Sequence, residues 1–180
     1  MMTTITLPAI ESGEVDLVTG GGKLRVPGYL LKEKSVQIDV EMAEQLVSAA
    51  RSAADGAYAP FSRFRVGAAV IMKDDPGKRI FSGSNVENSS FGATICAERA
   101  AIASASAQGL RKISLLAVST PETLDMPLSQ RSPCGLCRQV IREFADEDTL
   151  IICDSGEEEL LGDVLDIERL LPFGFRFATQ

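Results

Sequence analysis

Cys96-Ala97-Glu98 and Pro133-Cys134-Gly135-Leu136-Cys137 are the two segments that decide how this 180-residue chain is interpreted. Zinc accepts cysteine sulfur readily, and the two sulfurs of a C-x-x-C turn lie on one side of a metal ion. The chain has no histidine, so a mixed Cys/His zinc site and proton transfer through imidazole are both excluded. The pattern therefore predicts a three-thiolate zinc site in which Glu98 carries any proton that moves near the metal.

The zinc site is expected to keep one coordination position open. A structural zinc is normally closed by four Cys or His ligands, whereas a catalytic zinc keeps a position for water or substrate. The remaining cysteine, Cys153, follows the apolar run 150–152 and is typical of a buried, inert thiol. We also expect Arg99 to offset part of the thiolate charge through hydrogen bonds to sulfur; the alternative is an exposed helix arginine.

The order of helix and strand patterns predicts an α/β fold with helices on both faces of one sheet and parallel strand pairing late in the chain. Two helices are expected to begin at the cysteine segments, with Thr94 and Ser132 as their N-caps, so that the helix dipoles lower the thiol pKa. A further helix is expected before Gly56 and a last short one over 163–171. The expected strands cover 64–72, 79–83, 113–119 and 150–153.

Composition and charge exclude several classes of protein. The net charge of -7 argues against a nucleic-acid partner, which would need clustered Lys and Arg. No apolar run reaches the ~20 residues that span a bilayer, and the N-terminus lacks the features of a secretory signal. We therefore expect a cytoplasmic protein with a small-molecule substrate and no membrane partner. Residues 1–36 are expected to form an N-terminal arm, partly strand and partly loop, before a catalytic domain at 37–180.

Longer segments resemble the small homotetrameric zinc-dependent cytidine deaminases, and the Cys/Glu spacing is the three-cysteine form of the zinc-deaminase pattern. The resemblance covers roughly residues 44–175 and includes Leu170-Leu171-Pro172 with Phe175 at its C-terminal end. The other segments that carry it are Tyr58-Ala59-Pro60-Phe61-Ser62-Arg63-Phe64-Arg65-Val66-Gly67-Ala68-Ala69, Gly83-Ser84-Asn85-Val86-Glu87-Asn88, Thr94-Ile95-Cys96-Ala97-Glu98-Arg99-Ala100-Ala101 and Ser132-Pro133-Cys134-Gly135-Leu136-Cys137-Arg138-Gln139-Val140.

The resemblance implies a three-layer α/β/α sandwich with a mixed central sheet. It implies a zinc-dependent hydrolase that deaminates cytidine and 2′-deoxycytidine to uridine and 2′-deoxyuridine with release of ammonia, in pyrimidine salvage. It also implies a homotetramer with shared active sites. Residue by residue, the matches are the zinc ligands Cys96, Cys134 and Cys137, the proton shuttle Glu98, the ribose contacts Asn85 and Glu87, the base contact Phe64, the base contact Phe175 donated by a neighbouring subunit, and the backbone N–H of Ala97 and carbonyl of Ser132, which contact the pyrimidine edge and the leaving amine.

Other interpretations are weighed beside this one. A deaminase of a modified cytosine nucleoside would keep the cysteines, but the Asn85-Val86-Glu87-Asn88 segment favours a plain ribose. A polynucleotide editor is disfavoured by the acidic charge. An inactive zinc-binding structural or interaction protein would have no need for Glu98. Without the resemblance, Phe64 and Phe175 would be interpreted as core aromatic residues.

Overall fold

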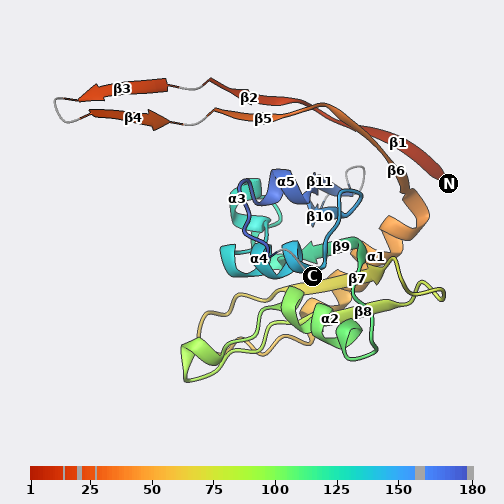
Figure 1. Cartoon of the computed structure of the whole chain (residues 1–180). Helices are drawn as coiled ribbons and strands as arrows, with labels where there is room; N and C mark the ends of the chain where they lie inside the picture. The colour runs from red at the N-terminus through yellow and green to blue at the C-terminus, as the bar shows by residue number, and fades with distance from the viewer. Residues whose placement is uncertain (14, 20–21, 27, 157–160, 178–180) are drawn as a thin grey trace. The chain divides into compact units, whose positions relative to one another are not determined.

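The computed structural model describes residues 1–13, 15–19, 22–26, 28–156 and 161–177 (Figure 1). The chain divides into two compact units, Met1–Asp39 and Val40–Gln180. Each unit is described by itself below.

The first unit is a two-stranded antiparallel ribbon (Figure 1). Threonine and other β-branched residues are frequent in its first strand, and such residues favour extended backbone. The strands pair as β1 (Met2–Leu7) with β6 (Lys34–Asp39), β2 (Ile10–Ser12) with β5 (Tyr29–Leu31), and β3 (Val15–Thr19) with β4 (Gly22–Val26).

The second unit is built on a five-stranded sheet in the order β11-β10-β9-β7-β8. Its strands are β7 (Gly67–Met72), β8 (Ile80–Ser84), β9 (Ile113–Ser119), β10 (Leu150–Asp154) and β11 (Gly162–Asp166). Only β9 and β10 pair in parallel; the other neighbours are antiparallel. The sheet is therefore mixed, and the parallel pairing expected from the late alternation of strands and helices holds for this one pair.

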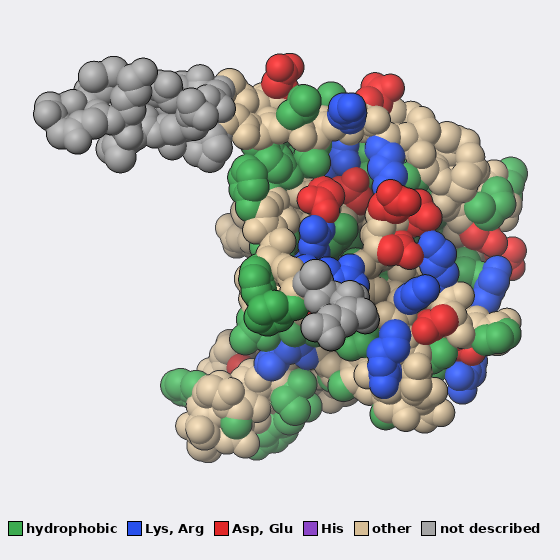
Figure 2. Space-filling view, in the orientation of Figure 1, with side chains coloured by type: hydrophobic (Ala, Val, Ile, Leu, Met, Phe, Trp, Pro, Cys, Tyr) green, Lys and Arg blue, Asp and Glu red, His purple; other side chains and the backbone are tan. Residues whose placement is uncertain are grey.

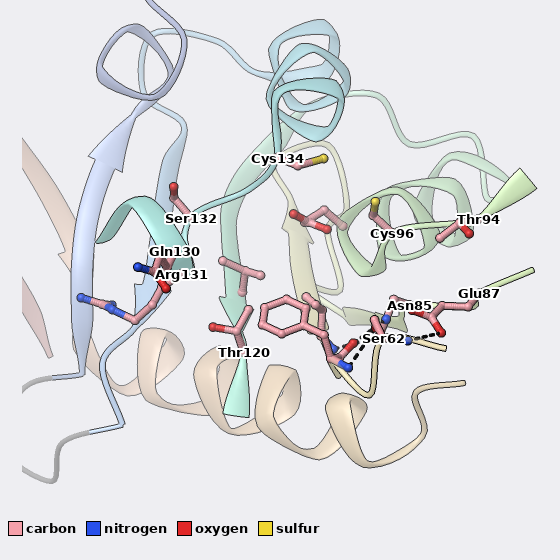
Figure 3. Close-up of a pocket in the computed structure, with 14 residues that line it drawn as sticks. Ser62, Asn85, Glu87, Thr94, Cys96, Thr120, Gln130, Arg131, Ser132 and Cys134 are labelled. Atoms are coloured by element: carbon pink, nitrogen blue, oxygen red, sulfur yellow. Dashed lines mark hydrogen bonds between the residues drawn. The ribbon is translucent and has the colours of Figure 1, made fainter. Parts of the chain in front are cut away.

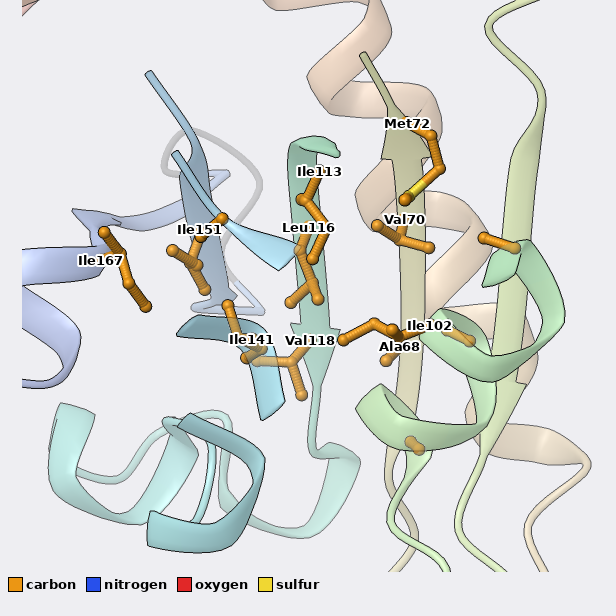
Figure 4. Close-up of a cluster of buried hydrophobic side chains, with 14 of the residues drawn as sticks. Ala68, Val70, Met72, Ile102, Ile113, Leu116, Val118, Ile141, Ile151 and Ile167 are labelled. Atoms are coloured by element: carbon orange, nitrogen blue, oxygen red, sulfur yellow. The ribbon is translucent and has the colours of Figure 1, made fainter. Parts of the chain in front are cut away.

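Helices cover both faces of the sheet. The buried side of α1 (Val40–Asp55) lies against β7, β8 and β9. The opposite face carries α2 (Ala97–Ser106), α4 (Gly135–Phe144) and α5 (Ile167–Leu170), whose apolar residues join one buried cluster (Figure 4). Short helical turns at Phe91–Ala93 (η1), Pro121–Thr123 (η2) and Leu128–Arg131 (α3) lie in the connections. The three-layer α/β/α prediction is confirmed.

Successive side chains of a strand point to opposite faces of the sheet, so each strand contributes to the packing on both faces. In β7, Ala68, Val70 and Met72 belong to the cluster on the side of α2, so the intervening Ala69 and Ile71 face α1. The other labelled members of that cluster in Figure 4 are Ile102, Ile113, Leu116, Val118, Ile141, Ile151 and Ile167.

A close contact between backbones places α2 on the sheet. A Cβ atom added at Gly83 in β8 would lie 2.5 Å from the Ala101 nitrogen and 2.7 Å from the Ala97 carbonyl oxygen. Only glycine allows the first turn of α2 to approach this strand so closely. The segment that begins with Cys96 is therefore fixed against the edge strand β8, which leads directly into residues 85–87.

The prediction of a last helix over 163–171 is wrong in its first half. Residues Gly162–Asp166 form the edge strand β11, antiparallel to β10, with Val164 opposite Ile152. The helix begins only after Asp166, whose side chain caps it by accepting a hydrogen bond from the Arg169 backbone. A strand this short carries too few residues for its period to be told from that of a helix.

On the face shown in Figure 2, acidic and basic side chains are interspersed, and no continuous basic stripe is visible. Among the described residues, no helix combines the length and the hydropathy needed to cross a membrane.

Candidate active site

Three cysteine sulfurs meet where α2 and α4 begin. The Sγ atoms of Cys96, Cys134 and Cys137 all lie within 4.8 Å of one another. Two thiolates bound to one tetrahedral zinc at ~2.3 Å would be about 3.8 Å apart, so only small movements separate this arrangement from a zinc site. Within the described part of the chain, no further Cys or carboxylate belongs to this group. The three residues therefore fit a zinc ion with one position left open.

Two of the three cysteines occupy helix N-cap positions. Cys96 precedes α2 and Cys134 precedes α4, both with extended backbone and neither with a capping hydrogen bond from its side chain. The prediction of Thr94 and Ser132 as N-caps is wrong: both lie two residues too early, and Ser132 instead ends α3. The observed caps bring the sulfurs closer to the positive ends of the two helices, where a thiolate is favoured.

The surroundings of Cys96 favour its ionised form. Hydrogen bonds from the Cys137 thiol and then from the Arg99 guanidinium lower the pKa of Cys96 to about 5, against the opposing effect of burial. The Arg99 Nη2 lies 3.9 Å from the Cys96 sulfur and 2.5 Å from the Thr94 carbonyl oxygen, to which it donates. This contact brings Arg99 next to one of the sulfurs; its expected role in offsetting the thiolate charge stays a prediction. By contrast, burial raises the pKa of Cys153 to about 12, as expected of an inert core thiol.

Glu98 is buried beside the sulfurs. Its residue surface is 3% exposed, and burial, with a further contribution from the Cys96 thiolate, raises the pKa of its carboxyl group. A carboxyl group with a raised pKa can both take up and release a proton near neutral pH. The side chain lines the same cavity as Cys96 and Cys134, so its proton can reach a bound molecule.

The cavity has a volume of about 400 Å³, enough for a small polar molecule such as a nucleoside. In Figure 3, Gln130, Arg131 and Ser132 lie on the left of the view, and Thr94, Asn85 and Glu87 lie on the right. The lining residues are Ser62, Phe64, Val66, Asn85, Glu87, Thr94, Cys96, Glu98, Val118, Thr120, Gln130, Arg131, Ser132 and Cys134.

Backbone hydrogen bonds join the segments that form the right-hand wall of the cavity, which carries Asn85, Glu87 and Thr94. The Val86 N–H donates to the Ile95 carbonyl at 2.9 Å, and the Ile95 N–H donates to the Val86 carbonyl at 3.0 Å. On the other side, the Tyr58 N–H donates to the Asn85 carbonyl at 2.9 Å, and the Tyr58 carbonyl accepts from the Glu87 N–H at 2.8 Å. The residues that follow β8 are thus fixed directly beside the segment that leads to Cys96.

Asn85 holds the segment that carries Phe64. Its amide Nδ2 donates to the Phe64 carbonyl at 2.9 Å, and its Oδ1 accepts from the Val66 N–H at 2.8 Å. The residue is 7% exposed. Each end of the amide still has one hydrogen-bonding position left, so Asn85 can bind a ligand while it orients Phe64.

Glu87 presents a carboxylate at the cavity edge. One oxygen accepts from the backbone N–H groups of Phe61 at 2.8 Å and Ser62 at 3.3 Å. Hydrogen bonds from the Ser62 side chain and the Phe61 backbone lower the pKa of Glu87. The ionised group is an acceptor, as a sugar hydroxyl requires.

Two residues predicted to contact the substrate are not among those that line the cavity. Ala97 is fully buried at the first position of α2, where its N–H belongs to the free end of the helix. Phe175 is 61% exposed, lies outside the cavity lining and stacks edge-to-face on Phe177 at 4.8 Å between ring centroids. The predicted substrate contacts of these two residues stay predictions.

Sequence reasoning found Ser132 but missed the rest of the left-hand wall of the cavity. Thr120, Gln130 and Arg131 line the cavity, although the composition of the stretch 120–131 indicates only a loop. The available signal was the position of Thr120, directly after the buried strand β9, because ligands gather at the carboxyl ends of such strands.

The chain is similar to known proteins over most of its length. The family model for the cytidine and deoxycytidylate deaminase zinc-binding region matches residues 40–153. A cytidine deaminase from Halalkalibacterium halodurans is 40% identical over 134 residues, which cover 73% of this chain and 92% of that protein. One from Sporosarcina psychrophila is 37% identical over 134 residues, or 73% and 90%. The crystal structure of a cytidine deaminase from Burkholderia pseudomallei matches with a TM-score of 0.62 and 37% identity over 73% of this chain and 97% of that chain.

Proposed function

The chain belongs to the cytidine and deoxycytidylate deaminase family, and from this premise we propose that it hydrolyses cytidine and 2′-deoxycytidine to uridine and 2′-deoxyuridine, with release of ammonia. The observation that carries the proposal is one cavity lined by two of the three clustered cysteines, a buried glutamate and the ribose-type contacts Asn85 and Glu87. A purely structural zinc site needs neither the cavity nor Glu98.

The residues divide the chemistry among them. When bound by the three sulfurs, zinc supplies a Lewis acid that makes a water molecule nucleophilic near neutral pH. Glu98 takes a proton from the attacking water and gives it to ring nitrogen N3 as the new oxygen bond forms at C4. The same carboxyl group then moves the second water proton to the 4-amino group. The C4–N bond breaks, ammonia leaves and the C4 carbonyl of uridine remains.

Other residues hold the substrate. Asn85 and Glu87 would bind the ribose hydroxyls, and the Phe64 ring would lie against the base. The Ala97 N–H and the Ser132 carbonyl would contact the pyrimidine edge and the leaving amine. Fixing the reacting atoms in this way turns a bimolecular step into one with a high effective concentration.

The assembly and the domain division are further parts of the proposal. We assign residues 37–180 to the catalytic domain and 1–36 to an arm outside it, because the family match begins at residue 40. Exposed Phe175 supports a homotetramer in which it completes a neighbour's active site. Pyrimidine salvage in the cytoplasm is the setting that this activity favours.

The test is direct. Purified protein is incubated with cytidine, and the ultraviolet change is followed as uridine forms, before and after removal of zinc by a chelator. Turnover that is lost on chelation and regained with zinc is the expected result. Parallel reactions with 2′-deoxycytidine and a cytosine-containing oligonucleotide separate a nucleoside deaminase from a polynucleotide editor. A zinc-loaded protein with no turnover on either nucleoside would overturn the proposal.

A further inference from the structure

The left-hand wall of the cavity depends on one buried arginine. The Arg131 side chain is 10% exposed, and all of its hydrogen bonds go to protein acceptors. Its Nε donates to the Met126 carbonyl at 2.8 Å, and its Nη1 donates to the carbonyls of Cys153 at 3.2 Å and Asp154 at 2.8 Å. Its Nη2 pairs with the Asp163 carboxylate at 2.5 Å. One side chain thus ties α3 to β10 and to the edge strand β11.

The end of β10 is itself rigidly held. The buried Asp154 carboxylate accepts from Arg51 of α1 at 2.9 and 2.6 Å and from the Ser119 hydroxyl of β9 at 2.7 Å. It also accepts from the Gly156 backbone at 2.9 Å. Arg131 bonds to the carbonyl of this same residue, so α3 is anchored to a point fixed from two other elements. A four-residue helix could not hold such a position through its own hydrogen bonds.

The residue after Arg131, Ser132, lines the cavity. Ser132 is bonded through its backbone N–H to the Leu128 carbonyl at 2.9 Å, and its hydroxyl accepts from Arg138 Nη2 at 2.9 Å. Within the described part of the chain, the Ser132 carbonyl oxygen has no hydrogen-bond partner. It is the contact to the leaving amine in the proposed function. Its position relative to the substrate is therefore set by the Arg131 anchor on one side and by Arg138 on the other.

The chemistry of this carbonyl distinguishes substrate from product. A fixed carbonyl oxygen accepts a hydrogen bond from the 4-amino group of cytidine. Uridine presents a C4 carbonyl at the same place, and two acceptors that face each other repel. Holding the Ser132 carbonyl rigidly favours cytidine and disfavours uridine, whereas a movable carbonyl would do neither well.

We propose that Arg131 is a positioning residue, which holds the Ser132 carbonyl in place and so lets the site bind cytidine in preference to uridine. The inference rests on the proposed function. Arg131 touches no reacting atom; it acts through the wall that it anchors. Asp163, on the edge strand, contributes by pairing with the guanidinium group.

The test compares KM for cytidine with the inhibition constant of uridine. Arg131→Met should raise the KM about five- to tenfold, the range of one hydrogen bond to the substrate, and lower the uridine constant rather than raise it, because a movable carbonyl repels uridine less. Arg131→Lys should restore part of the difference, because an ammonium group can still reach some of the acceptors. Asp163→Ala, at a half-exposed side chain, should shift the ratio in the same direction by less.

A matched control separates positioning from stability. Arg79→Met also removes a two-point ion pair with a buried carboxylate, that of Asp75, but Arg79 neither lines the cavity nor bonds to β10 or α3. It should lower the melting temperature while KM and the uridine constant stay within about twofold of the wild-type values. Zinc content is measured for every variant.

One result overturns the inference while the wild type is active: an unchanged ratio of the uridine constant to KM in the Arg131 and Asp163 variants that fold. This includes an equal change of both constants, as a general loss of structure would produce. If Arg131→Met fails to fold, Arg131→Lys and Asp163→Ala decide the question. An inactive, zinc-loaded wild type overturns the proposed function and this inference with it.

Discussion

Replacing Glu98 by glutamine tests the central chemical claim. Glutamine has almost the same shape as glutamate, but at neutral pH it neither accepts nor releases a proton. The Glu98 side chain has little contact with solvent, since the residue is only 3% exposed. Bulk water therefore has little access to replace the missing group.

The size of the effect follows from the role. General acid–base catalysis by a positioned side chain raises the rate by about 10²–10⁴-fold. In the proposed mechanism Glu98 transfers protons to two sites, N3 and the 4-amino group, in each turnover. We expect kcat to fall by about 10³–10⁴-fold, or roughly 4–5 kcal/mol in the activation barrier. Stability should be retained or rise, because burial raises the pKa of Glu98 and a neutral amide avoids the cost of burying the charge.

The assay combines three measurements on one preparation. Turnover of cytidine is followed in the ultraviolet, zinc is counted by elemental analysis, and the melting temperature is recorded. The control is Glu44→Gln, on the exposed side of α1, which should keep full activity. Activity above about a tenth of the wild-type rate in a zinc-loaded Glu98→Gln protein would refute the assigned role.

Three further predictions concern the metal, the substrate and pH. Cys134→Ala should lose zinc and melt at a lower temperature, as measured by elemental analysis and calorimetry, because one of three protein ligands is gone. Phe175→Ala should raise KM with little loss of melting temperature, since the ring is exposed in the single chain; an unchanged KM would remove it from the site. The pKa of Asp154 is lowered: burial alone would raise it, but hydrogen bonds from Arg51 and Ser119 outweigh burial. Its contribution to stability is therefore present above the unfolded pKa of about 3.9 and lost as the pH falls through the lower folded value. Asp154→Asn should be less stable at pH 7 and lose less stability on acidification than the wild type in urea titrations.

The cysteine cluster and the fold could be predicted from the sequence because their signals are local. The C-x-x-C turn and the Cys96–Glu98 spacing each lie within one helical turn, so the residue types alone limit the geometry. Because the chain has no histidine, ligand sets that mix Cys with His are excluded, and only thiolates and carboxylates remain. The strands β7, β9 and β10 are nearly continuous apolar runs, which is the pattern of strands in a sheet covered on both faces.

The left-hand wall could not be predicted because it depends on contacts across the chain. Arg131 bonds to residues 22, 23 and 32 positions away, and no spacing rule indicates those partners. The edge strand β11 is needed to place Asp163, yet its five residues are too few for the sequence pattern to distinguish a strand from a helix. Because β11 was predicted as part of a helix, the pairing of Asp163 with Arg131 could not be predicted either.

The charges around the predicted metal show why the N-cap position of the cysteines matters for function. Zinc with three thiolates carries a net negative charge, which weakens its action on water. Arg99 adds a positive charge at 3.9 Å from the Cys96 sulfur. The two helix N-termini add roughly half a charge each, and their effect falls off within the first turn. Caps at Thr94 and Ser132 would have placed the sulfurs farther along the helices. With Cys96 and Cys134 at the N-cap positions, both helix ends act directly on the predicted metal ligands.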